Sequence, residues 1–321
     1  MFFNSYSNFS LTGYGGCAFM RQMPRFQRII RPAKHFFLLS IALLGFCLFP
    51  AMAQESPIDD TDPELQQFIL ANTEFSVVHE LVHLLIDEIG FPVLGREEDL
   101  ADHLAIMLLL TRDGNDALPQ TMIDKLQAII DAWRVEWTII EQDQMEIAYS
   151  DPHSLEIQRL YDLSCLTYGR DPDHLKDFAI ANEIPVDRAE LCPEDFQKAE
   201  KGLKFLQNTF RNEKSDSQLK LIFDRTDTPK QATYKNWLTN ASILPAFITE
   251  IDSQYQFPQE VKIIFRSCGQ ANAYWEPADK EIVVCYGLMD RFVHLARFRQ
   301  EYAIDPREWA LGLAKAKSAF D

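Results

Sequence analysis

The chain has 321 residues, of which 47% are hydrophobic and 25% charged, so it can bury the core of one large domain or two small ones. It carries 31 basic and 48 acidic side chains, a net charge of −17. A surface this acidic repels phosphate groups, which argues against a nucleic-acid-binding protein.

The first 53 residues are typical of an export signal. Residues 1–35 contain five basic side chains and no acidic one, and the apolar run at 36–50 precedes the small-x-small site AMA at 51–53. The run is shorter than the ~20 residues that a membrane-spanning helix needs. We therefore expect a signal peptide, 1–53, that is cleaved after Ala53, and the alternative is an uncleaved anchor.

The mature chain predicted by this cleavage, residues 54–321, is an exported protein of the periplasm or the medium. Because the leader is long for a signal peptide, Met20 and Met23 are alternative starts to Met1. Without the leader, 26 basic and 48 acidic side chains remain, a net charge of −22. We expect no stable membrane span after cleavage, and the oligomeric state is open.

Four cysteines remain in the mature chain, namely Cys165, Cys192, Cys268 and Cys285. An even number of cysteines in an exported chain favours disulfides. We favour the pairs Cys165–Cys192 and Cys268–Cys285, because each closes a short local loop, and four buried free thiols are the alternative.

The apolar pattern predicts a mostly helical α+β domain in which a helical part, 62–210, precedes a sheet-containing part, 217–321. Helices are expected at 62–89, 96–112, 121–144, 153–169, 173–182, 193–210 and 230–256, and again beyond 288. Strands are expected at 219–224, 261–268 and 281–287. The last two flank GQANAYWEPADK, which contains turn residues, so we expect them to form a small antiparallel hairpin.

The segment SVVHELVHLLIDE contains an HExxH motif on the first predicted helix. His79 and His83 lie one turn apart, so both imidazoles can reach one metal ion, and Glu80 lies where its carboxylate could deprotonate a water on that ion. The neighbouring positions are apolar, and buried polar groups need partners that a metal supplies. The alternative is an ordinary helix whose histidines bond locally, because the motif also arises by chance.

A catalytic zinc ion requires a third protein ligand and an open position. Glu98 and Asp102 are four residues apart on the second predicted helix, so we expect Glu98 to bind the metal and Asp102 to orient a histidine. Glu97 and His103 are alternative third ligands. Acidic residues are also common at helix N-termini without any metal.

The run HELVHLLIDEIGFPVLGREEDLADHLA resembles the core of the "putative metallopeptidase" family of exported bacterial proteins, a zincin-like group. HSLEIQRLYDLSCLTYG, CPEDF and CGQANAYWEPADKEIVVCY resemble it too, so the likeness spans most of the mature chain. The resemblance implies a zinc peptidase with His79, His83 and Glu98 as ligands and Glu80 as base. The chain departs from the family pattern at Val82, where HELGH has glycine, and at Gly287, where an acidic residue is expected.

Two further segments are candidates for the substrate site. Asn272, Ala273 and Tyr274 resemble the edge strand that holds the substrate backbone in thermolysin-like zincins, although here the segment follows the HExxH motif. An ordinary surface hairpin is the alternative. His153 is a candidate donor to the developing oxyanion, and the alternative is a residue at a helix N-terminus.

These observations favour an exported, zinc-dependent peptidase that acts on a peptide or protein substrate. A non-catalytic zincin-like module that binds peptides or an envelope protein is the second hypothesis, and a plain helical domain is the third. Binding alone does not require Glu80, so the intact motif favours catalysis over the second hypothesis.

Overall fold

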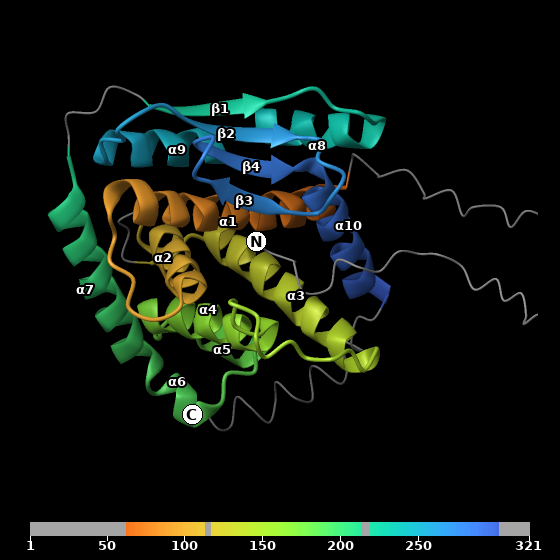
Figure 1. Cartoon of the computed structure of the whole chain (residues 1–321). Coiled ribbons are helices and arrows are strands. Elements are labelled where there is room, and N and C mark those ends of the chain that lie inside the picture. The colour runs from red at the N-terminus through yellow and green to blue at the C-terminus, as the bar shows by residue number, and fades with distance from the viewer. Residues whose placement is uncertain (1–61, 113–116, 213–217, 302–321) are drawn as a thin grey trace, which may run out of the picture. The chain divides into compact units, whose positions relative to one another are not determined.

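The structure, a computed structural model, describes residues 62–112, 117–212 and 218–301 (Figure 1). These residues belong to one compact unit. The predicted signal peptide, 1–53, and the helical segment expected near the C-terminus, 307–320, lie outside the described residues, so both stay predictions.

Helix α1 (Pro63–Leu84) is the central element of the fold. The Asp62 carboxylate accepts hydrogen bonds from the backbone N–H groups of Glu64 and Leu65, and Pro63 suits the first turn of a helix. The helix continues as a π-helical turn, η1 (Leu85–Ile89), which ends at Gly90 with a φ of 83°. The second half of α1 is buried on all sides, because other helices and two strands of the sheet pack around it.

The segment Pro63–Ile89 is the one stretch of the described residues that is long and apolar enough to cross a membrane by length and composition. Of its most apolar window, 89% is buried inside the protein. Such burial is typical of the core helix of a folded domain.

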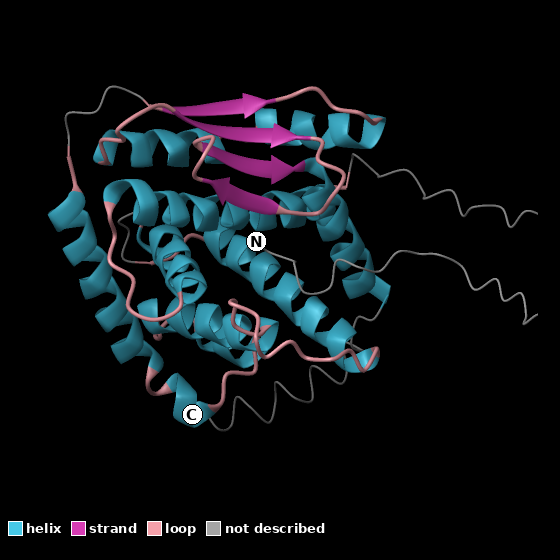
Figure 2. Cartoon of the chain, viewed as in Figure 1, coloured by secondary structure: helices cyan, strands magenta, loops and turns pink. Residues whose placement is uncertain are grey.

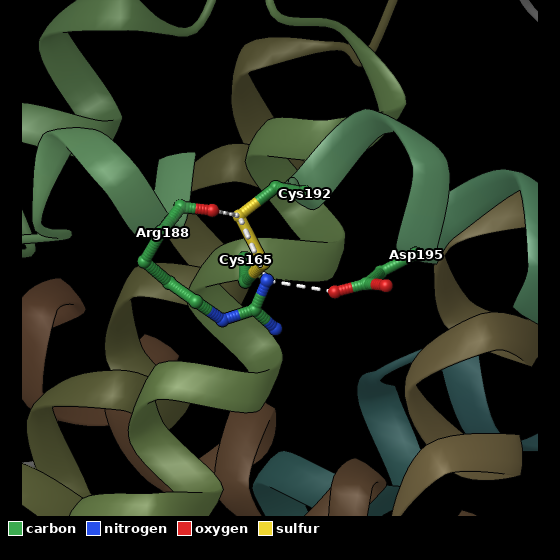
Figure 3. The surroundings of a disulfide bond; sticks show 4 residues. All are labelled: Cys165, Arg188, Cys192 and Asp195. Carbon is green, nitrogen blue, oxygen red and sulfur yellow. Dashed lines mark hydrogen bonds and ion pairs between the residues drawn. A yellow bond between two sulfur atoms is a disulfide. The ribbon is translucent and has the colours of Figure 1, made fainter. Parts of the chain in front are cut away.

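The remaining helices of the helical part pack on α1 and on one another. They are α2 (Glu97–Thr111), α3 (Gln120–Gln142), α4 (Glu156–Arg170), α5 (Lys176–Ala181), α6 (Val186–Ala189) and α7 (Cys192–Phe210). A disulfide joins Cys165 of α4 to Cys192 of α7, beside the ion pair of Arg188 with Asp195 (Figure 3). Gly169 is required next to it, because a Cβ there would lie 2.1 Å from the Cys192 carbonyl oxygen.

The sheet has four strands in the order β1-β2-β4-β3 and is mixed (Figure 2). Strand β2 (Val261–Arg266) pairs in parallel with β1 (Leu219–Phe223) and β4 (Glu281–Cys285), whereas β3 (Ala273–Glu276) is antiparallel to β4. Residues 282–285 are all buried, so both faces of β4 are covered. Helices α8 (Pro229–Asn240), α9 (Ile243–Gln254) and α10 (Tyr286–Glu301) complete the unit.

The predicted α+β class is confirmed, and two details of the prediction are wrong. The strands at 261–266 and 281–285 are parallel, because residues 273–276 form a strand of their own that reverses the chain between them. The helix predicted at 230–256 is two helices. Pro245 is tolerated in the first turn of α9, but in one continuous helix its ring would clash with the carbonyl of Ala241.

A second disulfide, Cys268–Cys285, joins the end of β4 to the segment that follows β2 and closes a loop that contains β3. Both disulfides have the predicted pairing. Gly287, where the family pattern has an acidic residue, has a packing reason, since a Cβ there would lie 2.4 Å from the Gln270 carbonyl oxygen. Disulfides persist in oxidising compartments, so the two bonds indicate an extracytoplasmic location.

Candidate metal centre

Helix α1 places the HExxH side chains in the interior of the protein. His79 and Glu80 are almost completely buried and His83 is 8% exposed. The spacing of four residues brings the two rings to the same face, where the Nε2 atoms lie 3.1 Å apart. Val82 is fully buried on another face, so it does not disturb this pair.

Helix α2 brings a carboxylate to the same point. Its Glu98 Oε2 lies 3.1 Å from His79 Nε2 and 3.2 Å from His83 Nε2. The three residues can offer one ligand atom each, and these atoms all lie within 4.8 Å of one another. His79, His83 and Glu98 are therefore a buried group that could hold a metal ion.

The hydrogen bonds of the two histidines show why this group suits a cation. The Nδ1 of His79 faces Asp102 at 2.9 Å and the Nδ1 of His83 faces Glu97 at 2.7 Å. Carboxylates only accept, so both Nδ1 atoms carry the proton and, in neutral rings, both Nε2 atoms present a lone pair. Two lone pairs and the Glu98 carboxylate then converge on one point, and a cation bound between them would stabilise this arrangement.

The same contacts shift the pKa values of His83 and Glu98. Burial lowers the pKa of His83, but the hydrogen bond with Glu98 and the charges of Glu80 and Glu98 outweigh it and raise the pKa to about 9. Burial raises the pKa of Glu98, but hydrogen bonds with His153, His79 and His83 outweigh it and hold the pKa far below its usual range. In the metal-free protein a proton on His83 therefore supplies positive charge next to the Glu98 carboxylate.

Asp102, which was predicted to orient a histidine, contacts His79 and is itself held by a buried arginine. Arg159 of α4 binds both of its oxygens, with Nε 2.7 Å from Oδ2 and Nη2 2.8 Å from Oδ1. Burial raises the pKa of Asp102, but the charge of Arg159 and the hydrogen bond with His79 lower it more, so the carboxyl stays ionised. The guanidinium also lies 4.6 Å from the centre of the Trp133 ring.

His153 lies in the segment before α4 and reaches the same carboxylate. Its Nε2 is buried 3.0 Å from Glu98 Oε2, and its Nδ1 is 3.0 Å from Asp151 Oδ1. Arg96 and Ser154 hold this segment against the start of α2, through Arg96 Nη2–Ser154 Oγ at 2.6 Å. His153 thus belongs to the candidate centre.

Strand β3 lies along α1 at the free edge of the sheet (Figure 1). The backbone N–H of Trp275 donates to Glu80 Oε2 at 2.9 Å, so the edge that faces away from β4 faces Glu80. Asn272 lies at the start of the strand, and its carbonyl accepts from the N–H of Cys285. Because the hydrogen-bonding direction alternates along a strand, the backbone of Ala273 faces the same edge as Trp275, and that of Tyr274 faces β4.

The two alternative third ligands occupy other positions. Glu97 contacts the Nδ1 of His83, whereas Glu98 faces the Nε2 of the same ring. His103 is about half exposed and lies 3.5 Å from Asp162. Two contacting groups were not expected from the sequence, namely Asp151 and the N–H of Trp275. The Trp275 contact is made by backbone and so left no sequence signal, whereas Asp151 could have been found from its Asp-x-His spacing.

Comparison with known proteins identifies a family. The sequence model of a protein family described as "putative metallopeptidase" matches residues 49–206 and 223–313, which include every side chain of the candidate centre. No curated protein and no solved structure matches the chain.

Proposed function

Because the chain belongs to this "putative metallopeptidase" family, we propose that it is an exported, zinc-dependent peptidase that hydrolyses peptide bonds. His79, His83 and Glu98 would hold the zinc ion. Zinc would act as a Lewis acid on the scissile carbonyl and make a water molecule nucleophilic at neutral pH. The observation that carries the proposal is the convergence of two imidazole lone pairs and a buried carboxylate beside Glu80.

Glu80 is the general base of the proposed reaction. It would take the proton of the attacking water and later pass it to the nitrogen of the leaving amine. The N–H of Trp275 donates to one of its oxygens at 2.9 Å, which fixes the orientation of the carboxylate. The site therefore contains a base that a purely structural metal site would not require.

His153 is the proposed donor to the oxyanion that forms as water attacks. Asp151 accepts from its Nδ1 at 3.0 Å and so fixes the orientation of the ring, and Nε2–H would be the donor to the oxyanion. The Nε2 already points to the candidate centre, since it lies 3.0 Å from Glu98.

The free edge of β3 is the proposed binding site for the substrate backbone. An extended peptide can add to an exposed strand through main-chain hydrogen bonds, and the backbone of Ala273 faces the required side. Asn272 and Tyr274 flank this position and would contact neighbouring parts of the peptide. The contact between this edge and Glu80 supports the proposal, because a peptide bound along the edge would lie next to the proposed base.

The test compares three proteins that are purified without chelator and supplied with zinc. Wild-type protein should bind one zinc ion and cleave unfolded casein or a quenched fluorescent peptide library. Glu80→Gln should keep the zinc and lose about 10²–10⁴-fold in turnover. Glu141→Gln, which alters an exposed carboxylate on α3, is the matched control and should be unchanged.

Two outcomes would reject the proposal. A fully active Glu80→Gln protein would show that another group is the base. Wild-type protein that binds zinc and peptides without cleaving any of them would favour the non-catalytic binding module. Export is tested separately by the mass of the mature protein, which should begin at Gln54.

A further inference from the structure

The two histidines of the candidate centre are held in unequal ways. The Nδ1 of His83 contacts Glu97, whose side chain is 46% exposed. The Nδ1 of His79 contacts Asp102, whose side chain is 8% exposed and sits next to Arg159, which is 4% exposed. One ring is therefore held by a carboxylate that water can reach, and the other by a buried ion pair.

The buried pair has a fixed geometry. The guanidinium of Arg159 contacts both oxygens of Asp102, at 2.7 and 2.8 Å, and such a two-pronged contact sets the plane of the carboxylate. Trp133 packs against the guanidinium and limits its movement. Oδ1 of Asp102 accepts hydrogen bonds from both Arg159 and the Nδ1–H of His79. The orientation of the arginine side chain therefore sets that of the His79 ring.

We propose that Arg159 is a positioning residue of the metal centre, which sets the orientation of His79 through Asp102 and thereby the affinity of the site for zinc. This inference deepens the proposed function and rests on it for the identity of the metal. It requires no step of catalysis, so binding measurements alone can test it.

Geometry, rather than charge, is the expected basis of the effect. The charge of Arg159 is balanced by that of Asp102, so the pair adds little net field at the centre. A lysine would keep the charge but lose the planar fork that binds both oxygens. Loss of a partner that orients a metal-binding histidine typically weakens metal affinity 10–100-fold.

The experiment measures zinc affinity by competition with a coloured chelator, together with the visible spectrum of the cobalt(II)-loaded protein. Arg159→Met and Arg159→Lys should each weaken zinc binding about tenfold or more and alter the cobalt spectrum. In the Asp102→Asn background, Arg159→Met should cost less than about threefold, because the arginine then has no carboxylate to orient.

The matched control is Arg291→Gln, which breaks another ion pair with a buried carboxylate, that of Arg291 with Glu136 at 3.1 Å. It should lower stability without changing zinc affinity. Wild-type zinc affinity in Arg159→Lys would overturn the inference, and so would an equal loss from Arg159→Met in both backgrounds. Arg159→Lys keeps a cation beside Asp102, so it provides the measurement even if Arg159→Met does not fold.

The failure of this inference can be told apart from that of the proposed function. Wild-type protein that binds no metal overturns both. Wild-type protein that binds zinc, with unchanged affinity in the Arg159 variants, overturns only the role of Arg159.

Discussion

The two ends of the candidate site are built in different ways. At the metal end, side chains from α1 and α2 converge, and each contact depends on which residue stands at that position. At the proposed substrate end, β3 presents backbone groups, and its position depends on the pairing with β4, on the Cys268–Cys285 disulfide and on contacts with η1. Substitutions at the metal end should therefore abolish metal binding. Substitutions at the substrate end should instead shift the position of the substrate.

The strongest test of the metal end is His79→Ala. The variant should lose zinc binding by roughly a thousandfold or more, because it removes a ligand and also leaves Asp102 without one of its two partners. Metal content after dialysis measures the effect. Zinc retained at one ion per chain would show that the metal binds elsewhere. The assignment of a metal end to α1 and α2 would then be wrong.

The substrate end is tested by removing its disulfide, with Cys268→Ser/Cys285→Ser. The bond spans 17 residues, so its loss should lower the free energy of unfolding by about 3 kcal/mol. Peptide turnover should fall while zinc affinity stays unchanged, because the loosened loop contains β3 but no ligand.

The other disulfide provides the control for that variant. Cys165→Ser/Cys192→Ser removes a bond that spans 27 residues and should cost a similar free energy, about 3.5 kcal/mol. It joins α4 to α7 and does not enclose β3. Equal loss of turnover in both variants, measured where both are fully folded, would mean that the Cys268–Cys285 loop has no special role at the substrate end.

The ion pair between α3 and α10, which lies outside both ends, is tested by Glu136→Gln. Burial raises the pKa of Glu136 on α3 to about 7, although Arg291 of α10 partly opposes the shift. Between pH 4.5 and 7 the folded protein keeps a proton that the unfolded chain has released, so stability falls as the pH rises. Relative to Glu136→Gln, the wild type should lose on the order of 2–3 kcal/mol across this window, as measured by urea unfolding.

The smallest expected effect comes from Trp275→Phe. The variant removes the bond from the indole N–H to Asp87, 2.7 Å long, but keeps the backbone N–H that holds Glu80. Stability should fall by about 1 kcal/mol, and turnover should fall modestly with zinc affinity unchanged. In the Asp87→Ala background the same substitution should have little further effect on stability, and a full effect there would assign the loss to packing of the ring.

The sequence was most informative where a contact depends on residue type at helical spacing. The HExxH motif placed His79, Glu80 and His83 on one helix, and the spacing of Glu98 and Asp102 placed both on one face of the next. The two disulfide pairs followed from the short loops that they close. These features are local, so the chain itself brings the groups together.

Contacts between distant segments could not be predicted in the same way. The bond from the N–H of Trp275 to Glu80 joins groups 195 residues apart and uses backbone, which every residue has. Arg159 and Asp102 are 57 residues apart, and no spacing in the sequence links them. The pairing of the strands at 261–266 and 281–285 was wrong for the same reason, because the sequence does not show that β4 pairs in parallel with β2 and antiparallel with β3.

The π-helical turn η1 makes the length of one short segment matter more than its composition. A π turn holds one residue more than the α-helical turn that it replaces, and each residue of an α-helix advances by about 100°. Deleting a single residue within 85–89 would let a regular helix form and leave His79, Glu80 and His83 untouched upstream. Asp87, which binds Trp275, and Glu88, which binds Lys280, would rotate away from the hairpin. A one-residue deletion could therefore uncouple substrate placement from metal binding without altering any residue that performs either task.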